Sequence, residues 1–225
     1  MRREGKVVRR LLSVTTVVTL LSGLAFLGYF GYRIWDPFAG ARQQQALGSL
    51  YHSWAIAPAP SAKPAPAASA KPAAVSCVTP EHPAIGQVFA TIQIPSFGSH
   101  WKFTVIQGTD LPQLATGPGH IPGTAFPGQP GNMGIAAHDV TAGNPFLHLV
   151  DLRPGDKVVI TTQDCVTTYG VNRNPYTVNY RDTAVLRPAG HERTITLVTC
   201  TPVGVLYFVP NRTIVQAAEV SSVPR

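Results

Sequence analysis

The chain has 225 residues and a formal net charge of +7, from 18 lysines and arginines against 11 acidic residues. From residue 80 onward, nine lysines and arginines balance nine acidic residues, so the positive excess lies entirely near the N-terminus. Without a basic patch, the folded part lacks the electrostatic footprint of a nucleic-acid-binding protein, and we expect no nucleic-acid partner.

An apolar segment near the N-terminus predicts a membrane anchor. Residues 11–32 carry no charge and are long enough to cross a hydrocarbon core as a helix. Residues 1–10 are rich in arginine and lysine, which by the positive-inside rule places this tail in the cytoplasm and the rest of the chain outside. Aromatic residues such as Tyr29 and Trp35 favour an uncleaved transmembrane helix over a signal peptide. We expect a single-pass protein of the cell membrane.

A juxtamembrane segment and stalk are expected over residues 33–77. Within it, residues 57–76 consist almost wholly of Ala, Pro, Ser and Lys. This composition cannot build a core, and its prolines favour an extended polyproline II conformation. Residues 78–225 remain, and they have the usual size of one folded domain.

The folded part shows an all-β pattern, because short β-type runs recur with turn residues between them. The runs are residues 87–94, 102–106, 134–137, 157–162, 167–172, 176–180, 194–199 and 213–220. This spacing favours a closed or sandwiched β domain. Residues 145–151 are the best candidate for a helical turn, and residues 117–134, dense in Gly and Pro, predict a long structured loop.

Three residues point to thiol chemistry. Cys200 ends a run of alternating apolar and β-branched residues, so we expect it at the end of a strand, where reactive groups are often displayed. Arg212 opens the next apolar run, and an antiparallel pairing of the two strands would bring its guanidinium near the sulfur. A nearby cation favours the thiolate, so Cys200 and Arg212 together with His138 suit acyl transfer.

The motifs around these residues resemble those of the sortase family, the membrane-anchored cysteine transpeptidases of Gram-positive bacteria. The stretches that carry the resemblance are residues 117–124, 134–138, 152–156 and 196–200, followed by residues 212–215. The resemblance implies an eight-stranded sortase-type β-barrel with one or two short helices. It also implies a catalytic triad of His138, Cys200 and Arg212.

A sortase-like activity follows from that resemblance. Cys200 would attack the Thr carbonyl of an LPxTG-like sorting signal on a secreted surface protein and form a thioester. An amine of the peptidoglycan precursor would then resolve the thioester. Two alternatives stay open: a pilin-polymerising sortase, and a catalytically silent, surface-tethered binding domain with the sortase fold.

The chain resembles sortase classes D and E about equally and departs from both. Asp139 stands where these classes usually have Arg, and Ile121 stands where many class E members have Tyr, which favours a proline-containing signal. Ile121, Thr199 beside the nucleophile, and His120 in the Gly/Pro-rich loop are candidates for substrate contact. For Thr199 and His120 we favour a structural role, with substrate contact as the alternative.

The three cysteines leave one thiol over, and outside the cytoplasm the other two could form a disulfide. We expect Cys200 to be free and Cys77 to pair with Cys165, two unrelated thiols being the alternative. The histidines show no ligand spacing with one another or with the cysteines, so we expect neither a metal ion nor a cofactor.

Overall fold

The computed structural model describes residues 15–29, 77, 82–188, 190–201 and 210–225. The chain divides into two compact units, Met1–Pro37 and Phe38–Arg225.

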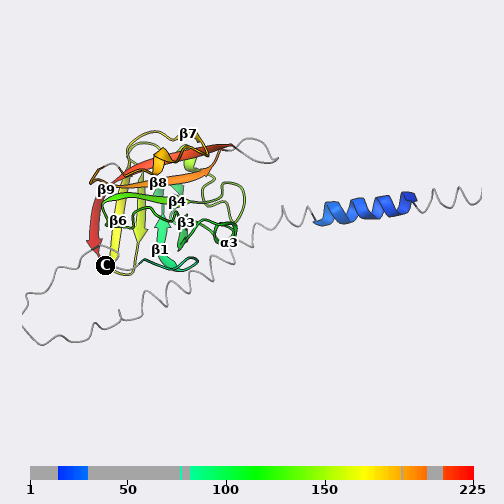
Figure 1. Ribbon diagram of the computed structural model, residues 1–225, viewed down its shortest axis with the longest axis horizontal. Coiled ribbons are helices and arrows are strands. Elements are labelled where there is room, and N and C mark those ends of the chain that lie inside the picture. The colour runs from blue at the N-terminus through cyan, green and yellow to red at the C-terminus, as the bar shows by residue number, and fades with distance from the viewer. Residues whose placement is uncertain (1–14, 30–76, 78–81, 189, 202–209) are drawn as a thin grey trace, which may run out of the picture. The chain divides into compact units, whose positions relative to one another are not determined.

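The first unit contains a helix over residues 15–29 (Figure 1). Among the helices that the structure describes, none reaches the length and apolarity needed to span a bilayer. The predicted span, residues 11–32, continues past this helix at both ends into residues outside the described part. The predicted tail, residues 1–10, and the segment 33–76 lie outside it as well.

In the described part of the second unit, nine β-strands form one sheet in the order β6-β5-β1-β2-β3-β4-β8-β9-β7. The strands are β1 (Val88–Gln93), β2 (Lys102–Gln107), β3 (Gly119–His120), β4 (Gly131–Ala136), β5 (Lys157–Thr161), β6 (Cys165–Val171), β7 (Tyr176–Asn179), β8 (Arg193–Cys200) and β9 (Asn211–Pro224). Because β6 also pairs with β9, the sheet closes into a barrel (Figure 1). The closed ring contains every strand except β7, which lies outside it on the first part of β9.

The predicted eight-stranded barrel is confirmed, but one of its eight strands is a different segment from the one we predicted. Each predicted run overlaps a strand, and β7 is one of them, although it lies outside the ring. The eighth member of the ring is β3, inside the predicted loop 117–134. A strand of only two residues has no alternation by which the sequence could reveal it.

Four short helical turns lie between the strands, where we expected one or two. They are η1 (Pro95–Phe97), α3 (Leu111–Leu114), η2 (Leu149–Asp151) and η3 (Thr183–Leu186). The predicted turn at residues 145–151 overlaps η2. Elements of three or four residues are too short to show helical periodicity, so the sequence did not reveal the others.

A close approach of backbone explains one glycine of the barrel. A Cβ on Gly119 would overlap the carbonyl oxygen of Gly108, and the N–H of Gly108 donates a hydrogen bond of 3.0 Å to the carbonyl of His120. Glycine at position 119 therefore lets β3 lie against the end of β2 and complete the ring.

Side-chain alternation along β8 decides which residues face the core. Ile195 and Leu197 are fully buried inside the barrel. The alternate residues Thr196, Val198 and Cys200 therefore lie on the opposite face of the sheet. The strand pattern thus keeps the Cys200 side chain out of the core.

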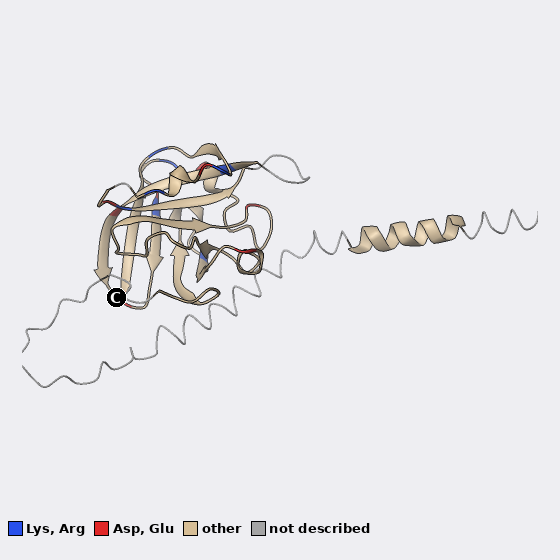
Figure 2. Ribbon diagram, in the orientation of Figure 1, with Lys and Arg blue, Asp and Glu red and all other residues tan. Residues whose placement is uncertain are grey.

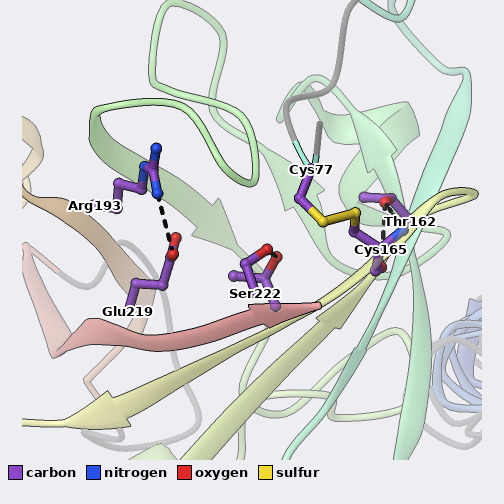
Figure 3. The surroundings of a disulfide bond; sticks show 7 residues. Cys77, Thr162, Cys165, Arg193, Glu219 and Ser222 are labelled. Carbon is purple, nitrogen blue, oxygen red and sulfur yellow. Dashed lines mark hydrogen bonds and ion pairs between the residues drawn. A yellow bond between two sulfur atoms is a disulfide. The ribbon is translucent and has the colours of Figure 1, made fainter. Parts of the chain in front are cut away.

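A disulfide joins Cys77 to Cys165, the pair expected from the sequence (Figure 3). The two Cα atoms are 5.5 Å apart and the residues are 88 positions apart in the chain. Cys165 begins β6 opposite Pro224, the last residue of β9. The bridge therefore lies at the end of β9 that is remote from Arg212, and Cys200 is a free thiol.

Candidate active site

Cys200 and Arg212 are direct neighbours across two antiparallel strands. Cys200, the last residue of β8, lies opposite Arg212 near the start of β9. Residues directly opposite in an antiparallel pair project on the same face, with Cβ atoms about 5 Å apart. Nη1 of Arg212 also donates a hydrogen bond of 3.0 Å to the carbonyl of Asn211. The strand pairing thus places the guanidinium on the face that carries the sulfur.

His138 reaches the same place from the other side of β8. Strands β4 and β8 are parallel, with Ala136 opposite Val198, and the N–H of Ala137 donates to the carbonyl of Val198 at 3.1 Å. His138 and Cys200 each follow this last pair by two residues, so the parallel strands lead both toward the same end of the sheet. His138, Cys200 and Arg212 are all half-buried. The ends of three adjacent strands thus bring the three catalytic candidates together.

Thr199 holds two of these strands together. Its side chain is only 3% exposed, and its hydroxyl donates a hydrogen bond of 2.8 Å to the carbonyl of Ala137. The bond ties the residue before His138 to the residue before Cys200. Thr199 therefore has a role inside the fold, the structural role that the sequence favoured over substrate contact.

His120 is fully buried, which supports its structural role over contact with substrate. Nε2 lies 2.9 Å from the carbonyl oxygen of Ala125, and Nδ1 lies 2.7 Å from Oε1 of Gln107. Its ring stacks on Phe126 at 4.4 Å. Burial lowers the pKa of His120 and favours the neutral imidazole. His120 thus stabilises the Gly/Pro-rich loop from within.

Ile121 lies on the face of the sheet that carries the triad. A Cβ on Gly134 would come within 2.9 Å of Cδ1 of Ile121 and 3.1 Å of Cδ2 of Leu186, so both side chains cover β4 at this glycine. Two residues further along β4, Ala136 is half-exposed, as is its partner Val198. Together they form an apolar surface that leads to His138 and Cys200.

Polar side chains from three strands hold the η3 turn over this surface. The carbonyl of Val185 accepts hydrogen bonds from Asn132 on β4 at 3.0 Å, Thr196 on β8 at 3.3 Å and Gln216 on β9 at 3.4 Å. The sequence alone did not reveal this network, because it exists only when these three strands are neighbours.

Tyr180, at the end of β7, is a further residue of the site that the sequence did not reveal. Its ring centroid lies 5.9 Å from the guanidinium carbon of Arg212 and 5.3 Å from that of Arg181. Its hydroxyl accepts a hydrogen bond of 2.9 Å from Nε of Arg181. The aromatic face therefore borders the candidate oxyanion group, within the range of a cation–π contact.

Burial and nearby charges set the ionisation of the site. Burial raises the pKa of Cys200, the Arg212 guanidinium opposes this increase, and the Asp139 carboxylate adds to it. Burial lowers the pKa of His138, and Asp139 partly offsets that decrease. At neutral pH the resting pair is therefore mostly thiol and neutral imidazole, and the thiolate–imidazolium pair is the minor form. The groups are those of nucleophilic acyl transfer.

Comparison with known proteins shows which family the domain that carries this site resembles. A family model described as a sortase domain matches residues 92–220. Sortase E1 of Streptomyces coelicolor is 38% identical over 87 residues, which cover 35% of this chain and 25% of that relative. The match thus spans about a quarter of the length of this curated relative.

Solved structures show the same similarity over most of the barrel. Sortase E from Streptomyces avermitilis is 35% identical with a TM-score of 0.57, covering 63% of this chain and 93% of that one. Sortase E1 from Streptomyces coelicolor, solved with a tripeptide in the active site, is 30% identical with a TM-score of 0.55. The similarity covers 64% of this chain and 94% of that one.

Proposed function

The chain belongs to the sortase family, and on that premise we propose that it is a membrane-anchored cysteine transpeptidase acting on an LPxTG-like sorting signal. The observation that carries the proposal is the strand register that sets Arg212 opposite Cys200. The parallel pairing of Ala136 with Val198, two residues before His138 and Cys200, supports His138 as the third member of the triad.

In the first step, the Cys200 thiolate attacks the carbonyl carbon of the threonine in the signal. The negative charge that develops on the carbonyl oxygen is stabilised by Arg212, whose guanidinium stays charged at any working pH. The C–N bond after the threonine then breaks, and the imidazolium of His138 protonates the leaving amine. The surface protein is left as a thioester on Cys200.

In the second step, an amine of the peptidoglycan precursor attacks the thioester carbonyl. His138, now neutral, accepts the proton of the attacking amine, and the C–S bond breaks to release the Cys200 thiolate. One amide bond is cleaved and another is formed, so the bonds and protons balance without a cofactor.

The surface beside Cys200 supports a peptide substrate with apolar residues on the N-terminal side of its threonine. Ala136 and Val198 are half-exposed, and Ile121 packs on the same face. The aliphatic Ile121 supports a proline-containing signal. The tripeptide in the active site of the Streptomyces coelicolor relative also supports binding of a short peptide at this position.

The helix of residues 15–29 supports membrane anchoring through residues 11–32. It carries no charged residue (Figure 2). Its leucines are exposed, for example Leu24 at 65% and Leu27 at 69%. The hydroxyl of Thr19 donates to the carbonyl of Thr15 in the preceding turn, so this polar group needs no water. We propose a cytoplasmic N-terminus and an extracytoplasmic catalytic domain, so removing residues 1–32 should move the protein from the membrane fraction to the soluble fraction.

Mass spectrometry of the full chain in detergent tests the activity. Incubation with a panel of sorting peptides, with Pro or Ala at the second position, should add the N-terminal peptide fragment to Cys200. A cell-wall cross-bridge amine should then release it as a new amide. Cys200→Ala is the matched control and should stay unmodified. If an alkylating reagent labels Cys200 but no peptide acylates it, the chain is a binding domain with the sortase fold. If only a lysine acceptor reacts, it is a pilin polymerase.

A further inference from the structure

Asp139 is a buried acidic residue at the centre of the site. Only 7% of it is exposed, although acidic side chains are rarely buried without a partner. Oδ1 accepts a hydrogen bond of 2.9 Å from the N–H of Val140. The residue follows His138 directly, three residues after Ala136, the last residue of β4 that pairs with β8, and its charge acts on Cys200.

The segment around Asp139 is held in one conformation. The N–H of Phe146 donates a hydrogen bond of 3.0 Å to the carbonyl of His138, and the Phe146 side chain is fully buried. Between them the chain turns through Ala142 and Asn144, both with φ of 54°, in the left-handed region that non-glycine residues rarely adopt. The loop therefore folds back on His138 and fixes the carboxylate beside it.

Two ionisable groups lie within the electrostatic reach of this carboxylate: His138, its neighbour in the chain, and Cys200 at the end of β8. Arg212 lies opposite Cys200 on β9. A fixed negative charge stabilises the imidazolium of His138 and destabilises the thiolate of Cys200. The positive charge of Arg212 opposes the effect of Asp139 on the Cys200 thiolate. Asp139 thus acts on both members of the nucleophile–acid pair, and both retain their protons to higher pH.

We propose that Asp139 is a positioning residue that sets the pH window of the reaction by acting on His138 and Cys200 together. The claim about the reaction rests on the proposed function, whereas the effect on Cys200 is measurable without any substrate. The population of the thiolate–imidazolium pair depends on the difference between the two pKa values. Because the Asp139 charge raises the pKa of both His138 and Cys200, it shifts the pH range of activity without greatly changing the maximal rate.

Asp139→Asn in the full chain is the central test. The amide oxygen can still accept the N–H of Val140, so the substitution removes the charge and keeps the turn. Alkylation of Cys200 by iodoacetamide should show its midpoint at lower pH than in the parent protein, with labelling several-fold faster at a fixed pH on the rising limb. With a sorting peptide, both limbs of kcat/KM should move to lower pH while the maximum stays close to that of the parent.

Further variants separate charge from structure. Asp139→Ser is also neutral and can accept the N–H of Val140, so it should reproduce the shift if the asparagine variant folds poorly. Asp139→Glu should restore the parental midpoint. Asp151→Asn removes an exposed carboxylate of the same β4–β5 connection, paired with His148 at 3.0 Å, and should leave the midpoint unchanged.

An unchanged thiol midpoint in Asp139→Asn and Asp139→Ser would overturn the proposal. A lower maximum with unmoved limbs would also overturn it, because that result indicates a purely structural residue. A shifted alkylation midpoint in a protein that acts on no sorting peptide would instead refute the proposed function and leave the electrostatic role of Asp139 standing.

Discussion

At the scale of single residues, main-chain pairing places the three catalytic candidates. Cys200 lies opposite Arg212 by antiparallel register, and His138 follows from the parallel register of β4 with β8. The hydroxyl of Thr199 adds a side-chain bond across the second pair. The site therefore depends on backbone that the barrel holds rigidly, so conservative substitutions of the three side chains should leave the fold intact.

Substitution of the three residues tests their roles. Cys200→Ala should abolish acyl-enzyme formation, because no other group supplies the sulfur. His138→Ala and Arg212→Ala should each lower kcat/KM by at least about 100-fold, the usual scale for loss of a general acid or an oxyanion donor. Steady-state transpeptidation with a fluorescent peptide measures this. Arg212→Lys keeps the positive charge but lacks the planar guanidinium group, so its kcat/KM should lie between those of the parent and of Arg212→Ala. Parental activity in any alanine variant would remove that residue from the mechanism.

The pH dependence follows from the two displaced pKa values. Burial lowers the pKa of His138 from its ordinary value of 6.5, which moves the acid limb of kcat/KM to lower pH. Burial raises the pKa of Cys200 from its ordinary value of 9.0, which moves the alkaline limb to higher pH. The profile should therefore be a broad bell. Arg212→Ala, which removes the cation near the sulfur, should move the alkaline limb to still higher pH. A narrow bell would contradict these directions.

At the scale of elements, β9 organises the site. Its first half pairs with β8 on one side and, over its first four residues, with β7 on the other, and its second half pairs with β6. The first part carries Arg212 and borders Tyr180 at the end of β7. One long strand thus closes the barrel at one end and completes the active site at the other.

The contact between β4 and the turns that cover it gives a prediction at this scale. Gly134→Ala would place a Cβ 2.9 Å from Ile121 and 3.1 Å from Leu186, so both side chains must move. We expect a loss of about 1 to 3 kcal/mol in the free energy of unfolding, typical of overpacking, and weaker peptide binding as the η3 turn shifts. Urea unfolding and KM measure the two effects.

A second substitution controls this result. Ile121→Ala removes the side chain nearest the added methyl group, so the double variant should recover part of the stability lost in Gly134→Ala. A double-mutant cycle measures the recovery as a coupling between the two sites. Strict additivity would show that the two residues do not press on one another.

At the scale of the whole molecule, one covalent bond ties the start of the folded unit to its barrel. Cys77 is joined to Cys165 at the end of β6, beside the last residues of β9 (Figure 3). Arg212 lies near the other end of β9, so the bridge and the active site occupy opposite ends of the strand. The disulfide should therefore affect stability much more than catalysis.

Removing this disulfide tests that separation. A bridge that closes a loop of 88 residues restricts the unfolded chain, and its loss should lower the free energy of unfolding by about 2 to 4 kcal/mol. The Cys77→Ala/Cys165→Ala variant and the reduced parent should unfold at similarly lower urea concentrations while kcat/KM stays near the parental value. Denatured, unreduced protein should show one free thiol. Three free thiols would contradict the Cys77–Cys165 disulfide.

The sequence was informative wherever a local pattern of residues determines the structure. Alternation of apolar and polar residues along 194–199 predicted a strand that puts Cys200 at its end, and β8 does so. The Thr213–Val220 run predicted the neighbouring strand, which lies within β9. The odd number of cysteines, with Cys200 assigned to thiol chemistry, left Cys77 and Cys165 as the predicted pair. Each inference uses only residues near one another in the chain or a count over the whole chain.

Tertiary structure alone decided the remaining features, because they depend on which distant segments become neighbours. His120 resembles a loop histidine in the sequence, yet β2, β3 and the following loop bury it completely. Thr199 bonds to a carbonyl 62 positions away, and Asp139 is buried beside a cysteine 61 positions further along. Strand register sets such contacts, and it is selected by the closure of the whole barrel and not by any local run of residues.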